Sequence, residues 1–257
     1  MEHYAAIILN RWDKLISIST YLVVDGYFSK KKFINPIVES TSLEIISKLR
    51  RDANLKYLYN GPQKKGRGRP KKYGDKVNLK NIDKRRFKQI YQDQDVIIYE
   101  CIVWSVSLKR KIKVAYVQFL DDGVLTNRYG VYFSTDLKLD GKLIYKYYKA
   151  RFQIEFLFRD AKQYTGLTHC QARSENKIYF HTNTALTAIG IAKIAHYFDH
   201  KKDKPSAKIP FSIADIKTSY FNELMLNLFL SNFDIDPKLM KNKKAINIIL
   251  DFGKIAA

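Results

Sequence analysis

The sequence predicts an α/β fold, in which an α/β core is interrupted by a β-rich insertion and followed by a helical C-terminal region. Helical and strand-like segments alternate over the first 50 residues, as in an α/β core. Strand-like segments then dominate residues 96–133, and helical periodicity dominates the chain from residue 177 onward. The prediction rests on the order of these three blocks.

The elements expected in the first block are a helix over 4–18, a strand over 20–24, a helix over 30–39 and a strand over 43–49. The first strand is short and β-branched, which is typical of a buried strand, and it ends at the carboxylate of Asp25. Ser29 is placed to cap the helix that follows. Pro36 lies inside that helix, so we expect a kink or a break there.

Residues 61–90 form the most basic segment, with twelve Lys or Arg and two Asp. Three glycines and a proline predict that this segment lacks regular structure: Gly66, Gly68, Pro70 and Gly74. The strands expected after it cover 96–106, 112–119 and 128–133, joined by turns at 108–111 and 121–123. The helices expected last cover 177–198, 213–230 and 237–252, with a linker at 200–210.

Composition favours a globular protein with a polyanionic partner. The chain has 257 residues, 46% of them hydrophobic, and 46 Lys or Arg against 25 Asp or Glu, for a net charge of +21. Such an excess is typical of nucleic-acid binding, and a merely basic surface is the alternative. Two distant cysteines predict neither a disulfide scaffold nor a zinc site, and no apolar stretch is long enough to span a membrane. We expect a protein of the reducing cytoplasm.

A run from Tyr148 to Lys162 places one acid among aromatic and cationic side chains. At about 100° per residue, Tyr148, Arg151, Glu155 and Lys162 fall within roughly 60° of one continuous helix. A second arc is apolar and is expected to face the core: Leu143, Ala150, Ile154, Leu157 and Ala161. A third arc is expected to face solvent: Lys146, Lys149, Gln153 and Asp160. An acid among cations on a half-buried stripe suits a metal ligand that works beside phosphate.

The spacing Tyr-x2-Arg-x3-Glu-x6-Lys matches, at all four positions, the YREK signature of DDE-type bacterial insertion-sequence transposases of the family-four group. The flanking segments also resemble this family: Phe133-Ser-Thr-Asp136-Leu before the signature and Gly166-Leu-Thr-His-Cys-Gln-Ala-Arg173 after it. The segment Tyr21-Leu-Val-Val-Asp25-Gly-Tyr-Phe-Ser is similar to the strand that carries the family's second acidic ligand. The resemblance covers roughly residues 10–200.

This resemblance implies a ribonuclease-H-like core that is incomplete at its N-terminus. It divides the chain into a partial core over 1–55, a basic loop and β-rich insertion over 56–130, the remainder of the catalytic core over 131–200 and a helical region over 201–257. It also implies a bacterial, nucleoid-associated transposase that moves its element by DNA hydrolysis and strand transfer.

The implied chemistry uses two Mg²⁺ ions about 4 Å apart, bound by acids from separate elements. By resemblance, Asp25 and Glu155 supply two of the three acids, and Mn²⁺ is the expected substitute for Mg²⁺. Taken without the resemblance, Asp25 is a turn residue beside Gly26, and Glu155 is an intrahelical partner of Arg151 or Arg159.

Double-stranded DNA is the implied partner, both as transposon ends and as target. Arg151 and Lys162 are then expected to donate to phosphates near the cleaved bond, Tyr148 to stack on a base or bond a phosphate, and Arg173 to assist. The alternative is that these side chains only solvate the helix. The run Arg67-Gly68-Arg69-Pro70 resembles an AT-hook, whose arginines enter a narrow A·T minor groove, and its alternative is a solvated loop.

The family's first acid has no counterpart here, because the sequence opens almost at the helix that precedes the second acid. Asp13 lies on that helix, and Asp136 lies after Asp25, where it could cap the next helix or approach the site. We therefore expect an N-terminally truncated frame that cleaves DNA poorly when alone. The resemblance implies either a homodimer or pairing with an intact transposase. The alternative function is a non-catalytic DNA-binding remnant that inhibits such a transposase, and an RNA-binding protein ranks last.

Overall fold

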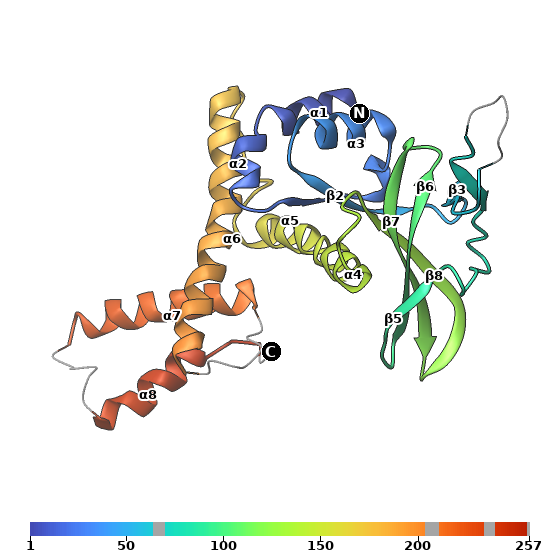
Figure 1. The fold of residues 1–257 in the computed structure, drawn as a ribbon. Coiled ribbons are helices and arrows are strands. Elements are labelled where there is room, and N and C mark those ends of the chain that lie inside the picture. Colours follow the sequence, from blue (N-terminus) through green and yellow to red (C-terminus); the bar gives the residue numbers. More distant parts are fainter. Residues whose placement is uncertain (64–69, 204–210, 234–239, 256–257) are drawn as a thin grey trace. The chain divides into compact units, whose positions relative to one another are not determined.

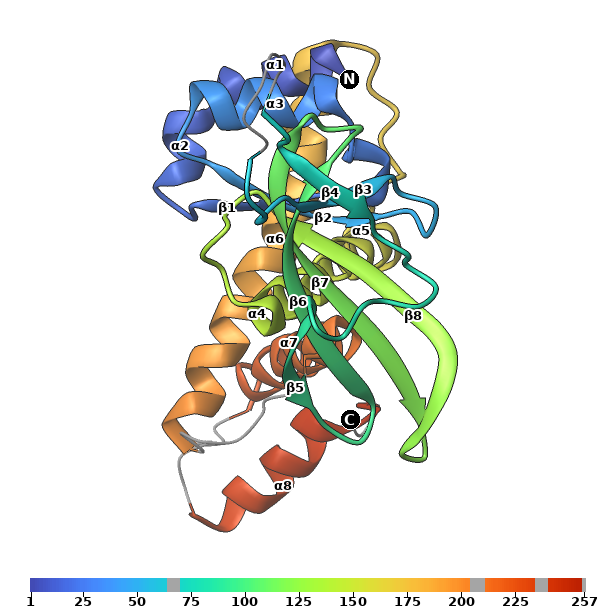
Figure 2. The ribbon, with the colours of Figure 1, turned by 45° about the vertical axis from the view of Figure 1, so that its right-hand side comes forward.

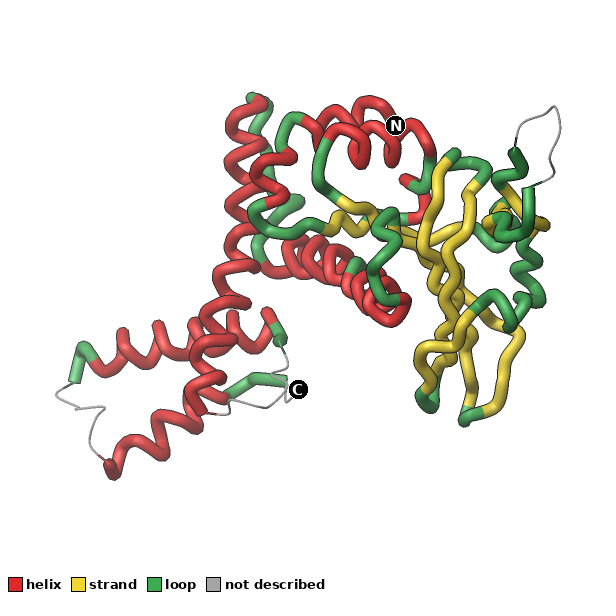
Figure 3. Tube along the Cα trace, in the orientation of Figure 1, coloured by secondary structure: helices red, strands yellow, loops and turns green. Residues whose placement is uncertain are grey.

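The computed structural model folds as two compact units, Met1–Phe152 and Gln153–Ala257. It describes residues 1–63, 70–203, 211–233 and 240–255. All strands among these residues belong to the first unit, and the second unit is built from helices (Figure 3).

The first unit comprises α1 (Glu2–Leu9), α2 (Trp12–Ile16), β1 (Tyr21–Val23), the 3-10 helix η1 (Gly26–Phe28), α3 (Lys31–Ser40), β2 (Glu44–Leu49), β3 (Leu55–Leu58), β4 (Tyr73–Lys76), β5 (Lys88–Gln92), β6 (Val96–Ser105), β7 (Arg110–Asp121), β8 (Val124–Ser134) and α4 (Gly141–Ala150). The second unit comprises α5 (Gln153–Tyr164), α6 (Glu175–Asp203), α7 (Ile213–Leu230) and α8 (Met240–Asp251).

One eight-stranded sheet organises the first unit (Figure 1). Its order is β1-β2-β8-β7-β6-β3-β4, and β5 pairs with the same strand β6 that carries β3. The pair β1–β2 is parallel and is connected through α3, as a parallel pair requires a crossover. The other pairs are antiparallel. The strands of the basic segment and of the insertion therefore extend the sheet that begins with β1 and β2.

Apolar cores cover both faces of this sheet. Because side chains alternate along a strand, Ile45 faces one core and its neighbour Ile46 faces the other. Helices α1 and α3 pack on the first face, and α4 packs on the second (Figure 1). Phe133 is fully buried on the first face, and Ile144 of α4 is fully buried on the second. These layers fix the ends of β1, β2 and α4, where the candidate site lies.

The predicted strands at 20–24 and 43–49 are confirmed as β1 and β2, and the three insertion strands are confirmed as β6, β7 and β8. The turn predicted at 121–123 is confirmed by positive φ angles at Asp122 and Gly123. The helices expected in the C-terminal region are confirmed as α6, α7 and α8.

Residues 61–90 were expected to lack regular structure, and that expectation is wrong for β4 and β5. Tyr73 pairs with Leu58 of β3, and Lys88 pairs with Glu100 of β6. Pairing with an existing strand edge overrides the weak local propensity of this Gly- and Lys-rich sequence.

Local expectations at the N-terminus also need correction. The helix predicted over 4–18 is two helices, α1 and α2. The break expected at Pro36 does not occur, because α3 continues past this residue to Ser40. Lys30, not Ser29, is the N-cap of α3, because the Ser29 hydroxyl instead donates to the Lys48 carbonyl at 2.9 Å.

Candidate active site

Asp25 lies two residues after the end of β1 and is held in place by the turn that it starts. Its carboxylate caps η1 by accepting a hydrogen bond from the Tyr27 N–H at 2.9 Å. Its backbone carbonyl accepts a hydrogen bond from the Ser47 hydroxyl of β2 at 3.1 Å. The Asp25 side chain is 50% exposed, so one edge of the carboxylate remains open to solvent. The position combines a fixed backbone with an accessible charge.

Arg151, the C-cap residue of α4, faces this carboxylate. Its guanidinium lies 3.9 Å from the Asp25 carboxylate, at the outer limit of an ion pair. It also lies over the ring of Tyr148, 5.6 Å from the ring centre, and Tyr148 packs on Tyr132 of β8. The Arg151 side chain is only 22% exposed. Stacking on Tyr148 thus orients a largely buried cation toward Asp25.

The end of β2 adds cations that sequence reasoning missed. Parallel strands end at the same edge of a sheet, so the segment after β2 lies beside Asp25. The resulting open cavity has a volume of about 700 Å³ and is lined by Asp25, Tyr148, Arg151 and the segment 48–52. That segment contributes Lys48, Arg50 and Arg51. The signal for these cations was the basic run at the end of the predicted strand over 43–49. In a parallel pair with the strand before Asp25, that run lies at the same edge of the sheet as Asp25.

Asp136 is held by β1 and does not cap α4. Its carboxylate accepts hydrogen bonds from the Tyr21 hydroxyl at 2.7 Å and from the Lys138 N–H at 2.8 Å. The N-cap of α4 is instead Asp140. Burial acts to raise the pKa of Asp136, but these hydrogen bonds outweigh it and lower the pKa. The same hydrogen bond raises the pKa of Tyr21 to about 12.

Changing Tyr21 to Phe is expected to lower the free energy of unfolding by about 1–2 kcal/mol at pH 7, because it removes a hydrogen bond to a charged group. A lowered Asp136 pKa contributes stability that is present above about pH 4 and is lost as the pH falls. The difference between wild type and variant should therefore shrink at pH 3. Urea unfolding at both pH values measures it, with the exposed Tyr27→Phe as the control. An equal difference at pH 7 and pH 3 would contradict the role of the charged carboxylate.

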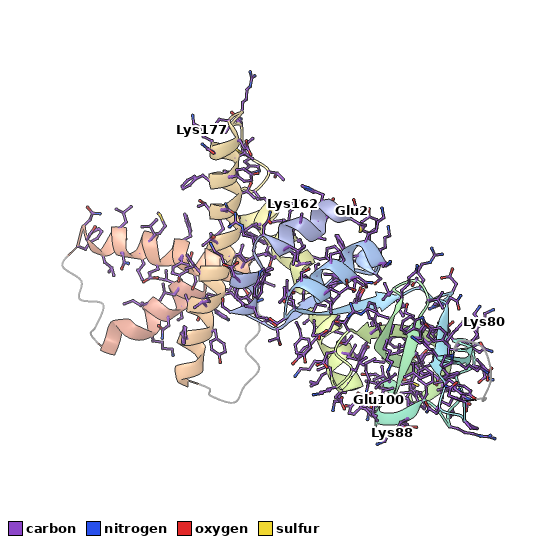
Figure 4. The ribbon with its side chains drawn as sticks, turned by 45° about the horizontal axis from the view of Figure 1, so that its top comes forward. Glu2, Lys80, Lys88, Glu100, Lys162 and Lys177 are labelled. Carbon is purple, nitrogen blue, oxygen red and sulfur yellow. The ribbon has the colours of Figure 1, made fainter. Side chains whose placement is uncertain are left out.

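Glu155 and Lys162 lie on α5 in the second unit, in its first and last turns (Figure 4 labels Lys162). Both are exposed. The helix dipole favours a negative charge in the first turn of α5, where Glu155 lies, and a positive charge in the last turn, where Lys162 lies. Arg173 is exposed in the segment before α6. Of the predicted site residues, the structure brings together Asp25, Tyr148 and Arg151 in the first unit. Arg67 and Arg69 lie outside the described residues.

The single helix expected across the signature is wrong. Helix α4 ends at Ala150 and α5 begins at Gln153. Between them, the N–H groups of Arg151 and Phe152 bond carbonyls three residues back, at 3.2 Å each. Tyr148 and Arg151 therefore do not share a helix with Glu155 and Lys162.

The burial of side chains along α5 also differs from the expected pattern. Ile154, expected in the core, is 50% exposed, whereas Asp160, expected in solvent, is 7% exposed. Leu157 and Ala161 are in the core of the second unit, as predicted. Buried Asp160 accepts two hydrogen bonds from the Arg159 guanidinium, at 2.9 and 2.8 Å. Arg159 is thus engaged by its neighbour along the helix.

The donor chemistry at Asp25 fits a hard cation. Asp25 offers a half-exposed carboxylate, with one oxygen fixed by a backbone N–H and the other on the side of the cavity. Carboxylate oxygen is the ligand that Mg²⁺ prefers. In the part of the chain that the structure describes, no three His, Cys, Asp or Glu side chains gather as a metal site.

The comparison with protein families decides the family. The family model described as a transposase DDE domain matches residues 4–191, well over half of the chain. The chain belongs to the DDE transposase family. Searches of curated proteins and of solved structures gave no match. In the transposase, Asp25, Tyr148, Arg151, Glu155 and Lys162 all lie inside the matched range. No helix among its described residues is long and apolar enough to cross a membrane.

Proposed function

We propose that this chain catalyses Mg²⁺-dependent hydrolysis and strand transfer at transposon ends, as a member of the YREK group with a ribonuclease-H-like core. One observation carries the proposal: in a chain of the DDE transposase family, the Asp25 carboxylate just after β1 lines the cavity that Tyr148 and Arg151 also line. An accessible carboxylate beside cations is the arrangement that binds a cation and a phosphodiester together.

Asp25 and Glu155 are the residues that would hold the metal. When bound, Mg²⁺ supplies activation of the attacking oxygen and neutralises charge on the phosphate. The protein's own part is positioning: the Tyr27 N–H fixes the Asp25 carboxylate, and Tyr148 fixes the Arg151 guanidinium. Arg151 donates to a phosphate oxygen once DNA enters the cavity.

Double-stranded DNA is the proposed partner. The net charge of +21 supplies long-range attraction to the phosphate backbone. The cations at the end of β2 contact the strand beside the cleaved bond. We propose phosphate contacts by Lys162 and Arg173, minor-groove contacts by Arg67 and Arg69, and action either as a homodimer or paired with an intact transposase.

The second candidate is a non-catalytic DNA-binding protein of the same lineage that inhibits an intact transposase. The ion pair between Arg151 and Asp25 favours it, because the guanidinium already balances the carboxylate that would otherwise bind a cation. Both candidates bind DNA with strong salt dependence.

Cleavage of labelled transposon-end DNA distinguishes the candidates. The first candidate requires nicking that depends on Mg²⁺ or Mn²⁺ and stops with EDTA. Binding without nicking, at protein concentrations that saturate the DNA, would establish the second candidate. Phosphate contacts weaken as salt is raised from about 50 to about 200 mM. DNA binding that does not weaken over this range would contradict both candidates.

A further inference from the structure

The sheet face on which α4 packs also carries aromatic and lysine side chains, in a part that α4 does not cover. Residues directly opposite one another on paired strands share a face. Trp104 of β6 lies opposite Lys56 of β3 on one side and Lys111 of β7 on the other. Lys56 in turn lies opposite Lys76 of β4. These four side chains form a row across β7, β6, β3 and β4.

Two further contacts place a second aromatic ring at the centre of this row. Tyr73 of β4 lies opposite Leu58, across a β-bulge from the Lys56–Lys76 pair, and its ring contacts place it on the same face. The rings of Tyr73 and Trp104 are 4.8 Å apart at their centres, with 34° between their planes. The Lys56 ammonium lies 5.9 Å from the centre of the Tyr73 ring. We call Tyr73, Trp104, Lys56, Lys76 and Lys111 the aromatic–lysine face.

Helix α4 covers the other half of the same sheet face. Its first residue, Gly141, donates its N–H to Glu100 of β6 at 3.0 Å, and its apolar side packs on residues such as Ile98 and Val117. Trp104 lies four residues farther along β6, on the face of Glu100. Strands β3 and β4 lie at the end of the sheet (Figure 2). Trp104, Tyr73 and Lys56 are half-buried, and Lys76 and Lys111 are exposed.

The charge on this face calls for an anionic partner. Lys56 and Lys76 lie directly opposite each other, and like charges at such positions destabilise a sheet. The acid on the neighbouring part of the face, Glu100, is engaged by Lys113 at 2.8 Å, with both side chains mostly buried. Figure 4 shows Glu100 within the strand-rich part of the first unit, with Lys80 and Lys88. Lysines alone would suit any polyanion, but ring pairs suit one that presents planar groups.

We propose that the aromatic–lysine face binds a single DNA strand, with unpaired bases stacked on Trp104 and Tyr73 and phosphates placed on Lys56, Lys76 and Lys111. Aromatic side chains interleaved with cations on an open sheet bind single strands because every base offers a flat π-face. In a duplex these base faces are covered by neighbouring base pairs. The proposal rests on the proposed function only in naming DNA as the nucleic acid.

Tryptophan fluorescence tests the proposal directly, because Trp12 and Trp104 are the two tryptophans of the chain. In a Trp12→Phe background, the fluorescence signal reports Trp104 alone. A 12-nucleotide single strand should quench it saturably and bind at least ~10-fold more tightly than the blunt duplex of the same sequence. A strand with abasic sites at its centre should quench weakly, since it keeps the phosphates and lacks the stacking groups.

Paired lysine variants test the phosphate contacts without touching the rings. Lys56→Gln with Lys111→Gln should weaken single-strand binding about 10-fold and reduce the salt slope by about 1.4, at ~0.7 per contact. Lys14→Gln with Lys31→Gln, which removes the same charge from exposed helix positions, should change binding less than twofold. Circular dichroism checks that each variant is folded.

Several outcomes would overturn the proposal. They are equal affinity for the duplex, no quenching of Trp104, equal losses in the two lysine pairs, or at least tenfold tighter binding of RNA. Its failure is separable from that of the proposed function. The fluorescence titration needs no cleavage, and cleavage measured on blunt duplex ends needs no aromatic–lysine face.

Discussion

Replacing Asp25 with asparagine is expected to lower Mg²⁺-dependent cleavage of transposon-end DNA by on the order of 10³-fold, corresponding to several kcal/mol of lost charge stabilisation. Asparagine keeps an oxygen that accepts the Tyr27 N–H, so η1 should persist, but it removes the negative charge that a cation needs. Single-turnover cleavage with protein in excess measures the loss. This assay detects slow cleavage, so it works even when the wild-type rate is low. DNA affinity should stay unchanged or rise, since an anion facing phosphate is removed.

Asp52→Asn is the matched control, because Asp52 lines the same cavity and pairs with Arg50 in an exposed ion pair at 3.1 Å. It should change cleavage less than about threefold, in line with the small value of surface pairs. Glu155→Gln should reproduce the loss seen at Asp25. If both acids bind the same metal ions, the double variant should be no slower than the slower single variant. Losses that multiply would assign the two acids to separate steps.

Phe133→Ala is expected to reduce the free energy of unfolding by about 3–5 kcal/mol, because it leaves a cavity in the core between the sheet and the helices α1 and α3. Phe133 is fully buried and lies on β8, between β2 and β7. Against a typical total of about 5–15 kcal/mol, such a loss takes a large share of the stability. Urea unfolding followed by tryptophan fluorescence measures it, since Trp104 reports on the sheet of the same unit.

Phe180→Ala makes the same chemical change at a side chain that is 74% exposed. It should alter the free energy of unfolding by less than about 0.5 kcal/mol. A loss at Phe133 of under about 1 kcal/mol would show that the core repacks around the cavity.

Strand identity in this fold was predictable wherever hydrophobic residues alone specify it. The β-branched run before Asp25 and the long apolar strands of the insertion became β1, β6, β7 and β8. Strands β4 and β5 were not predictable, because Lys- and Gly-containing segments become strands only when an edge such as that of β6 is available for pairing. Local sequence does not encode that edge.

The sequence pointed to three residues that the fold brings together, but not to the geometry around them. Asp25, Tyr148 and Arg151 line one cavity. The continuous helix through Glu155 failed because the chain between 142 and 162 holds neither Gly nor Pro, so nothing in it signals the tight turn at Arg151 and Phe152. The cations after β2 were overlooked because their value depends on β1 and β2 being parallel, which spacing alone does not show.

The turn at Asp25 has an entropic consequence. The hydroxyls of Ser29 and Ser47 lie 2.8 Å apart, and Ser29 also bonds the Lys48 carbonyl, so the segment after β1 is pinned to β2 at both ends of η1. Fixing the backbone of one residue costs about 1–2 kcal/mol of conformational free energy, and here folding has already covered that cost. The cation that we propose at Asp25 would therefore meet a carboxylate whose main chain needs no further ordering. Removing the Ser47 hydroxyl by Ser47→Ala should therefore weaken cation affinity, although Ser47 itself does not touch the ion.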